Sequence, residues 1–171
     1  QVPLTVTNRI LTLSGVRNAT LEGFTFAGGH ERLTGYGGGV FAANVTNLTV
    51  QNCRFLRNRT ISTGNAYGGG LAATNCTGLI SNCLFIGNFA ATTTGHGTGC
   101  RGGGLYLLGG TITLHNLRLH GNYSAAGSGG YRNSNYDSAG GIWMGGAGAS
   151  FVGKNLLIVN NEGGGLMVDR G

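Results

Sequence analysis

The sequence predicts an all-β solenoid, in which short parallel strands stack coil upon coil around one core. Three observations predict this fold class: glycine recurs at fixed places, a second short motif follows those glycines at a nearly constant distance, and apolar and polar residues alternate between them. The chain has 171 residues, including 36 glycines and a single proline, and only 9% of its residues are charged. This length fits one domain. The composition excludes coiled coils and helical bundles, and the lack of a three-residue glycine period excludes collagen.

A repeated pair of motifs sets the period of the solenoid. The first is a run of glycines ending in an aliphatic residue, and the second runs from a phenylalanine or aliphatic residue to an asparagine three positions later. The second begins 14 to 16 residues after that aliphatic residue, whereas the segments before the next glycines vary in length. Such spacing is expected of stacked coils with insertions at one corner. The glycine motif occurs at 37–40, 68–71, 102–105 and 163–166, with an altered copy at 139–142; the asparagine motif occurs at 55–58, 85–88, 119–122 and 158–161, with a degenerate copy at 26–29.

Apolar and polar residues alternate within the constant segments, as in Leu48-Thr49-Val50 and Ile112-Thr113-Leu114. A period of two places the apolar side chains on one face of a strand. We expect about five coils with three short strands each, which bury a continuous core only when stacked at about 4.8 Å per step. The glycines then serve a corner with positive φ or a close approach of neighbouring backbones. Two internal ladders are predicted, one of Val40, Leu71, Leu105, Ile142 and Leu166, the other of Phe26, Phe55, Phe85, Leu119 and Ile158.

The pairing of Gly-Gly-aliphatic with Phe-x-x-Asn resembles the repeat of chlamydial polymorphic outer-membrane proteins. The resemblance extends from about Leu11 to Leu166. It implies a single-stranded right-handed parallel β-helix, like the passenger regions of those autotransporters, together with secretion, surface display and often adhesion. The C-terminal membrane domain of that family is missing from the sequence, which suits a passenger fragment, and the glycosylation motifs described below suit a eukaryotic extracellular glycoprotein on the same plan.

The variable insertions carry five of the six tyrosines and several arginines. Because the coils stack, these insertions would project from one corner and form a single lateral surface. Tyrosine and arginine are favoured at recognition surfaces, and arginine pairs with carboxylates or sulfates. The alternative is that the tyrosines hold one insertion against the next. The candidate binding residues are Tyr36, Tyr67, Arg101, Tyr123, Tyr131, Arg132 and Tyr136.

Catalytic chemistry finds little support in the sequence. Glycoside hydrolysis needs two facing carboxylates, and Asp137 and Glu162 are the only pair that occupies the same corner in neighbouring coils. We expect no cofactor and no metal, since no acidic cluster or pair of His/Cys motifs is present. No apolar stretch is long enough for a transmembrane helix. The net charge of +6 comes from scattered arginines and indicates anionic glycans or an acidic matrix rather than nucleic acid.

The four cysteines fall into two pairs. Cys53 and Cys83 occupy equivalent inward positions in adjacent coils, where they form either a disulfide or a ladder of buried thiols. Cys76 and Cys100 fall at different corners, so their pairing would require the 89–101 insertion to fold back, and an intermolecular partner is the alternative. An oxidising compartment is compatible with either state.

Six Asn-x-Ser/Thr motifs are better indicators of compartment. They favour an extracellular protein, secreted or at the cell surface. Asn18 and Asn47 are expected at equivalent corners one coil apart, where two glycans would be crowded, and a buried asparagine ladder would compete with glycosylation at the last positions of the second motif. The candidate glycosylation sites are Asn18, Asn44, Asn47, Asn58, Asn75 and Asn122, of which Asn44, Asn47 and Asn75 are the best placed.

The ends of the solenoid lead to a functional expectation. No capping segment is evident, residues 2–6 look like the last strand of a preceding coil, and residues 166–168 look like a first strand. We expect an extracellular structural scaffold that stacks head to tail into a filament or forms an adhesive shaft, with copies of itself or glycans as partners. The alternatives are a segment of a longer β-helix, an adhesin passenger, and a β-helix that binds or degrades polysaccharides.

Overall fold

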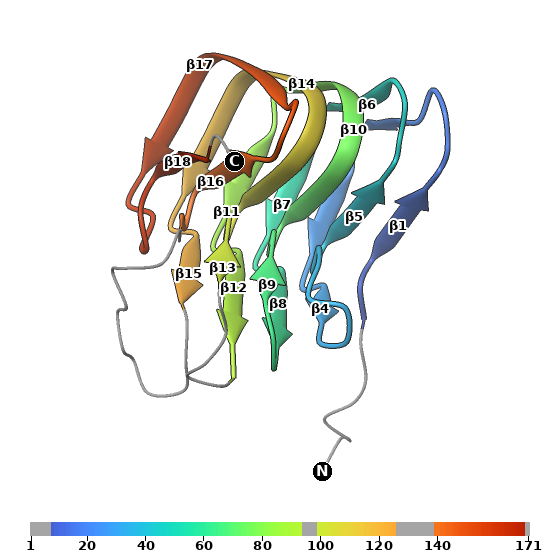
Figure 1. Cartoon of the computed structure of the whole chain (residues 1–171). Coiled ribbons are helices and arrows are strands. Elements are labelled where there is room, and N and C mark those ends of the chain that lie inside the picture. The colour runs from blue at the N-terminus through green and yellow to red at the C-terminus, as the bar shows by residue number, and fades with distance from the viewer. Residues whose placement is uncertain (1–7, 94–98, 126–138, 170–171) are drawn as a thin grey trace.

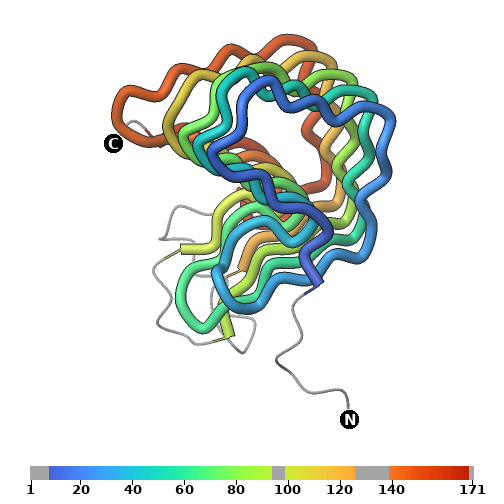
Figure 2. The backbone as a smooth tube through the Cα atoms, turned by 90° about the vertical axis from the view of Figure 1, so that its right-hand side faces the viewer, coloured from blue at the N-terminus to red at the C-terminus, as the bar shows by residue number. Residues whose placement is uncertain are grey.

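The chain forms a parallel β-solenoid. The computed structural model describes residues 8–93, 99–125 and 139–169, and within these ranges it contains strands and no helix. The strands pair in parallel with their counterparts in the next pass of the chain. Figure 2 shows these passes lying on one another around a common axis, with the first pass at one end and the last at the other. The predicted all-β solenoid is therefore confirmed.

Three columns of paired strands surround the main core (Figure 1). The long strands β10, β14 and β17 continue from one column into another, whereas turns separate the shorter strands. The first column contains β1 (Leu11–Ser14), β5 (Val40–Ala43), the start of β10 (Leu71–Ser81), the start of β14 (Leu105–His120), β16 (Ile142–Gly145) and β18 (Leu166–Asp169). The second contains β2 (Thr20–Glu22), β6 (Leu48–Gln51), the later parts of β10 and β14, and the start of β17 (Ser150–Val159). The third contains β3 (Thr25–Ala27), β7 (Arg54–Leu56), β11 (Leu84–Ile86) and the ends of β14 and β17.

Both predicted internal ladders are present in register. In the first column, Val40, Leu71, Leu105, Ile142 and Leu166 are successive partners, and Leu11 precedes them. In the third column, Phe26 pairs with Phe55, which pairs with Phe85, followed by Leu119 and Ile158. The rings of Phe55 and Phe85 stack at 4.5 Å. Equal spacing in the sequence thus becomes direct contact, because each pass adds one strand to each column.

Asparagine and glycine occupy the turns between the columns because the backbone there has positive φ, which asparagine tolerates better than most residues. The corner between the second and third columns has φ between 52° and 72° at Gly23, Asn52, Asn82, Asn116 and Asn155, the last two within the continuous strands β14 and β17. The exposed amides also bond between layers: Asn116 donates to Asn82 at 3.0 Å, and Asn155 donates to Asn116 at 3.0 Å.

A second, buried row of asparagines explains the last position of the second motif. Asn58, Asn88 and Asn122 are fully buried, and Asn161 follows them. The amide of Asn88 donates to Phe55 O at 2.8 Å and to Asn122 Oδ1 at 2.9 Å, while its own Oδ1 accepts from the backbone and side chain of Asn58, both at 3.0 Å. Each side chain therefore joins the layers above and below, and we refer to this row as the buried asparagine ladder.

Each of the three glycines of the first motif is required for a different reason, as residues 68–70 show. Gly68 has φ +63°, a conformation that favours glycine. A methyl group on Gly69 would overlap the backbone of Phe89, and one on Gly70 would collide with the carbonyl of Gly104 and the amide of Asn88. Both predicted reasons, positive φ and close backbone approach, therefore apply, each to a different glycine.

The variable insertions form strands of their own, which the sequence does not predict. They build a lateral lobe beside the main core, seen as the smaller ring in Figure 2. Because each insertion finds its pairing partner in the equivalent insertion of the next layer, short segments without a core of their own become ordered strands. The lobe contains one sheet of β4 (His30–Glu31), β8 (Arg59–Ser62), β12 (Phe89–Thr92) and β15 (Tyr123–Ala125), and a second of β9 (Ala66–Tyr67) and β13 (Cys100–Arg101).

Candidate functional sites

A row of stacked aromatic rings joins the lateral lobe to the main core. Tyr36 and Tyr67 come from the returning parts of the insertions, and their rings lie 5.0 Å apart. Tyr67 stacks on Tyr106 of β14 at 4.6 Å, and Tyr106 stacks on Trp143 of β16 at 4.8 Å. The guanidinium of Arg101 lies 4.6 Å from the centre of the Trp143 ring. These residues hold the insertions against the outward face of the first column.

This packing changes the interpretation of three candidate binding residues. Tyr67 is only 8% exposed, and burial raises the pKa of its hydroxyl. Tyr36 and Arg101 are partly buried in the same row. The row corresponds to the alternative in which tyrosines join one insertion to the next. It gives Tyr67 too little exposed surface to contact a ligand.

Tyr123 lies on the outer side of the lobe. It is partly exposed and stacks on Phe89 at 5.0 Å with an interplanar angle of 7°. The remaining candidates of this corner, Tyr131, Arg132 and Tyr136, lie outside the described residues. So does Asp137, one half of the only carboxylate pair. Its predicted partner Glu162 is exposed and is placed by backbone bonds to Asn122 and Ser124.

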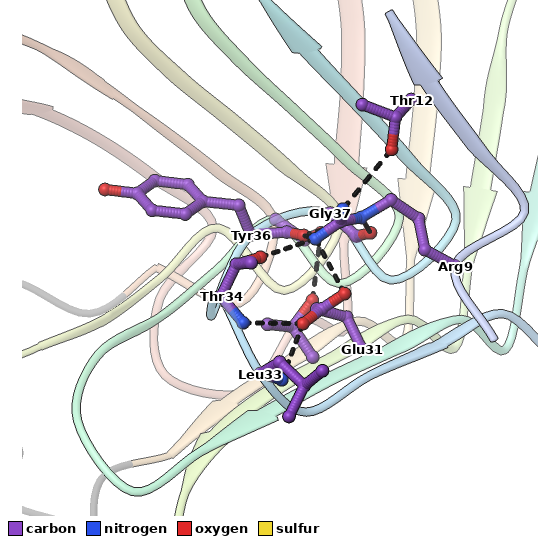
Figure 3. Close-up of polar contacts among 9 residues, drawn as sticks. Arg9, Thr12, Glu31, Leu33, Thr34, Tyr36 and Gly37 are labelled. Atoms are coloured by element: carbon purple, nitrogen blue, oxygen red, sulfur yellow. Dashed lines mark hydrogen bonds and ion pairs between the residues drawn. The ribbon is translucent and has the colours of Figure 1, made fainter. Parts of the chain in front are cut away.

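A buried ion pair closes the N-terminal end of the lobe (Figure 3). Arg9 lies 2.7 Å from Glu31, whose side chain is 1% exposed. The other carboxylate oxygen of Glu31 accepts from the backbone N–H groups of Leu33 at 2.6 Å and Thr34 at 2.7 Å. Arg9 also donates to the carbonyls of Tyr36 and Gly37. Burial lowers the pKa of the Arg9 guanidinium, and the charge of Glu31 opposes that shift.

This ion pair is a structural element that the sequence analysis missed. The two residues stand 22 positions apart, and no motif connects them. The available signal was the scarcity of acids: a glutamate inside an insertion of a chain with five acidic residues needs a cation nearby if it is to be buried.

All four cysteines are buried and free. Cys53 and Cys83 precede the paired residues Arg54 and Leu84, so they are stacking neighbours as expected, and they form the buried-thiol alternative rather than the disulfide. Their thiols donate to backbone carbonyls, and burial raises the pKa of Cys83 to about 12. Cys76 belongs to the main core, whereas Cys100 packs with Ala66 and Ala90 in the lobe.

The six glycosylation motifs divide into two groups. Asn18, Asn44, Asn47 and Asn75 are exposed and have positive φ at the corner between the first and second columns, Asn75 within the continuous strand β10. Asn47 donates to Asn18 at 2.9 Å, which confirms that these two corners are neighbours. Asn58 and Asn122 are members of the buried asparagine ladder, so the expectation that they carry glycans is incompatible with this fold: a sugar on either amide nitrogen would displace two interlayer hydrogen bonds.

Two features of the described residues concern metal binding and membrane crossing. No group of three or more His, Cys, Asp or Glu side chains there is arranged to hold a metal ion. No described segment is a helix of the length and apolarity that crossing a membrane requires. The chain matches no protein-family model, no curated protein and no solved structure.

Proposed function

We propose that this chain is an extracellular β-solenoid scaffold that extends end to end and acts by its shape and surface rather than by catalysis. The observation that carries the proposal is a set of apolar side chains that stay exposed on the outermost described strands of the repeating columns. At the C-terminal end, Leu166 and Val168 continue the inward ladders of the first column, yet they are 49% and 56% exposed. At the N-terminal end, Ile10 and Phe24 are similarly exposed.

The repeat makes such ends complementary to one another. Leu11 and Leu166 belong to the same ladder, so a strand that fits on one layer fits on any layer. In a head-to-tail contact, a second copy placed by translation would bury these exposed apolar residues and pair with the outermost described strands.

The proposal includes the finer description of the fold. We take the solenoid to be right-handed, with about five coils of three short strands each, a description supported by the register of the first column and by the resemblance to polymorphic outer-membrane protein repeats. An extracellular location is supported by the four exposed glycosylation motifs. Sugars there would project from one corner of the shaft, between the first and second columns.

Sedimentation velocity over a concentration series, combined with electron microscopy, tests the association. Leu166→Lys places a charge in the end contact, and Val152→Lys is a matched control because Val152 is also 49% exposed but points outward from β17. We expect assemblies from the unaltered chain and from the Val152 variant, and none from the Leu166 variant. Monomers alone at every concentration of the unaltered chain would contradict the proposal.

A further inference from the structure

One side of the solenoid is basic. It comprises the outward positions of the third column, the turn that follows it, and the outward positions of the lobe sheet that begins with β4. Arg54 and Arg118 are outward residues of the third column, two layers apart, with Leu84 between them. Arg57 stands at the turn, and Arg59 is the outward residue at the start of β8. All four are exposed, and we call this set the basic face.

No carboxylate among the described residues neutralises the basic face. Glu31 forms its ion pair with Arg9 inside the lobe, and none of the four arginines of the basic face takes part in it. Glu22 lies in the second column, in register with Gln51, and Asp169 lies in β18. Glu31 pairs with Thr60 beside Arg59, but its side chain is buried against Arg9, and Glu162 follows Tyr123 at the C-terminal end of the lobe. The face therefore presents guanidinium groups to solvent over several layers.

Arg57 has a backbone conformation that arginine does not favour. Among the described residues it is the one residue other than asparagine or glycine with positive φ, at 52°. The equivalent turns of other layers use Gly28, Gly87, Gly121 and Asn160. The Arg57 side chain extends over Gly87 in the next layer, with its Cγ 3.6 Å from the position a Cβ would take there. A strained arginine in a position that glycine or asparagine fills in the other layers points to a role outside folding.

From these observations we infer that the basic face binds a sulfated polysaccharide. Arginine forms a planar pair of hydrogen bonds with sulfate or carboxylate oxygens. In a parallel stack with a step of about 4.8 Å, Arg54 and Arg118 lie about 10 Å apart along the solenoid axis, with Arg57 and Arg59 beside them. An extended polyanion with charges on successive sugars meets this row at several points, whereas a small anion meets one.

The aromatic residues beside the face favour a polysaccharide over a nucleic acid. Single-stranded nucleic acids gain much of their affinity by stacking bases on open aromatic faces. Phe89 and Tyr123 stack on each other, and the guanidinium of Arg59 lies 6.0 Å from the centre of the Phe89 ring. Arg59 and Tyr123 thus lie on either side of the Phe89 ring, which offers no open stacking platform beside the basic face. The inference does not depend on end-to-end association, because the face lies along the side of each chain.

Binding of heparin is the direct test. The variant carries Arg54→Gln, Arg57→Gln and Arg118→Gln, and its matched control is Arg17→Gln, which removes an exposed arginine at the turn between the first and second columns. We expect the unaltered chain and the control to bind, with log K falling linearly against log salt. The triple variant should bind more weakly, with a slope smaller by about one for each arginine removed. Equal affinity and slope for the triple variant and the control would overturn the inference.

Arg57→Gly separates binding from folding. Glycine adopts the positive φ without strain, so this variant should melt at the same or a higher temperature and yet lose affinity for heparin. A variant that melts higher and binds heparin as tightly as the unaltered chain would show that Arg57 does not contact the ligand, which contradicts the inference.

Two other polymers and one spectroscopic probe define the ligand class and its location. Neutral dextran should not bind, and a single-stranded oligonucleotide of the same charge as the heparin should bind more weakly; equal or tighter oligonucleotide binding would overturn the assignment to polysaccharide. Heparin should shift the imidazole resonances of His30 and His120, which share columns with Arg59 and Arg118, but not those of His115 in the second column. Shifts confined to His115 would place the binding elsewhere and reject the basic face.

Discussion

Replacing Asn88 by alanine should lower the free energy of unfolding by about 3 kcal/mol. The side chain is fully buried and makes four hydrogen bonds, to Phe55, Asn122 and twice to Asn58. Alanine leaves the Asn58 backbone N–H and the Phe55 carbonyl without these bonds, at about 1–3 kcal/mol for each buried group. The small cavity left behind adds to that cost.

The matched control is Asn116→Gly. Asn116 belongs to the exposed row, with hydrogen bonds of 3.0 Å to Asn82 and Asn155, and glycine accepts its φ of 52°. Because water replaces an exposed amide, this change should cost no more than about 0.5 kcal/mol. Urea titration followed by the fluorescence of Trp143, the single tryptophan and a buried one, measures both variants. A difference between them below about 1 kcal/mol would refute the view that the buried row carries a larger share of stability than the exposed one.

Three further predictions concern other parts of the chain. Peptide mapping by mass spectrometry of chain secreted from eukaryotic cells should find glycans at exposed positions such as Asn75 and none at buried Asn58, whose occupation would contradict the ladder. Burial raises the pKa of Cys83 from 9.0 to about 12. As the pH rises, the unfolded chain therefore loses this proton before the folded chain does, so the free energy of unfolding should fall between pH 9 and 12. A change in the urea midpoint between pH 8 and pH 10 that is the same in the unaltered chain and in Cys83→Ala would count against this prediction. Glu31→Ala should cost about 3 kcal/mol in urea titration because Arg9 stays partly buried without its partner, whereas Arg17→Ala should cost little.

The sequence predicted most of the main core for a simple reason. In a solenoid with equal passes, residues at the same place in each repeat become neighbours, so the offsets between Val40 and Phe55 or Leu71 and Phe85 already contain the register. Alternation with a period of two then assigns each side chain to the inside or the outside. The same reasoning anticipates that, at Asn58, a buried asparagine ladder competes with glycosylation.

The lateral lobe was less accessible to this reasoning because its insertions differ in length. Their strands β8 and β12 are four residues long, and only pairing with strands of the neighbouring layers makes them strands. The direction in which Tyr67 points depends on the outward face of a strand 39 residues later, at Tyr106. A short insertion has too little pattern of its own to reveal such a contact.

By itself the sequence determined the class of fold, the two apolar ladders and the positions of the turns, since all of these follow from repeat spacing and from the backbone preferences of glycine and asparagine. Only the tertiary structure decided that the insertions pair into a lobe, that Tyr67 and Arg101 pack inward, that Arg9 meets Glu31, and that four arginines share one side. Those outcomes depend on contacts between segments of unequal length. Their spacing along the chain carries no period, so their neighbours are fixed only when the layers stack.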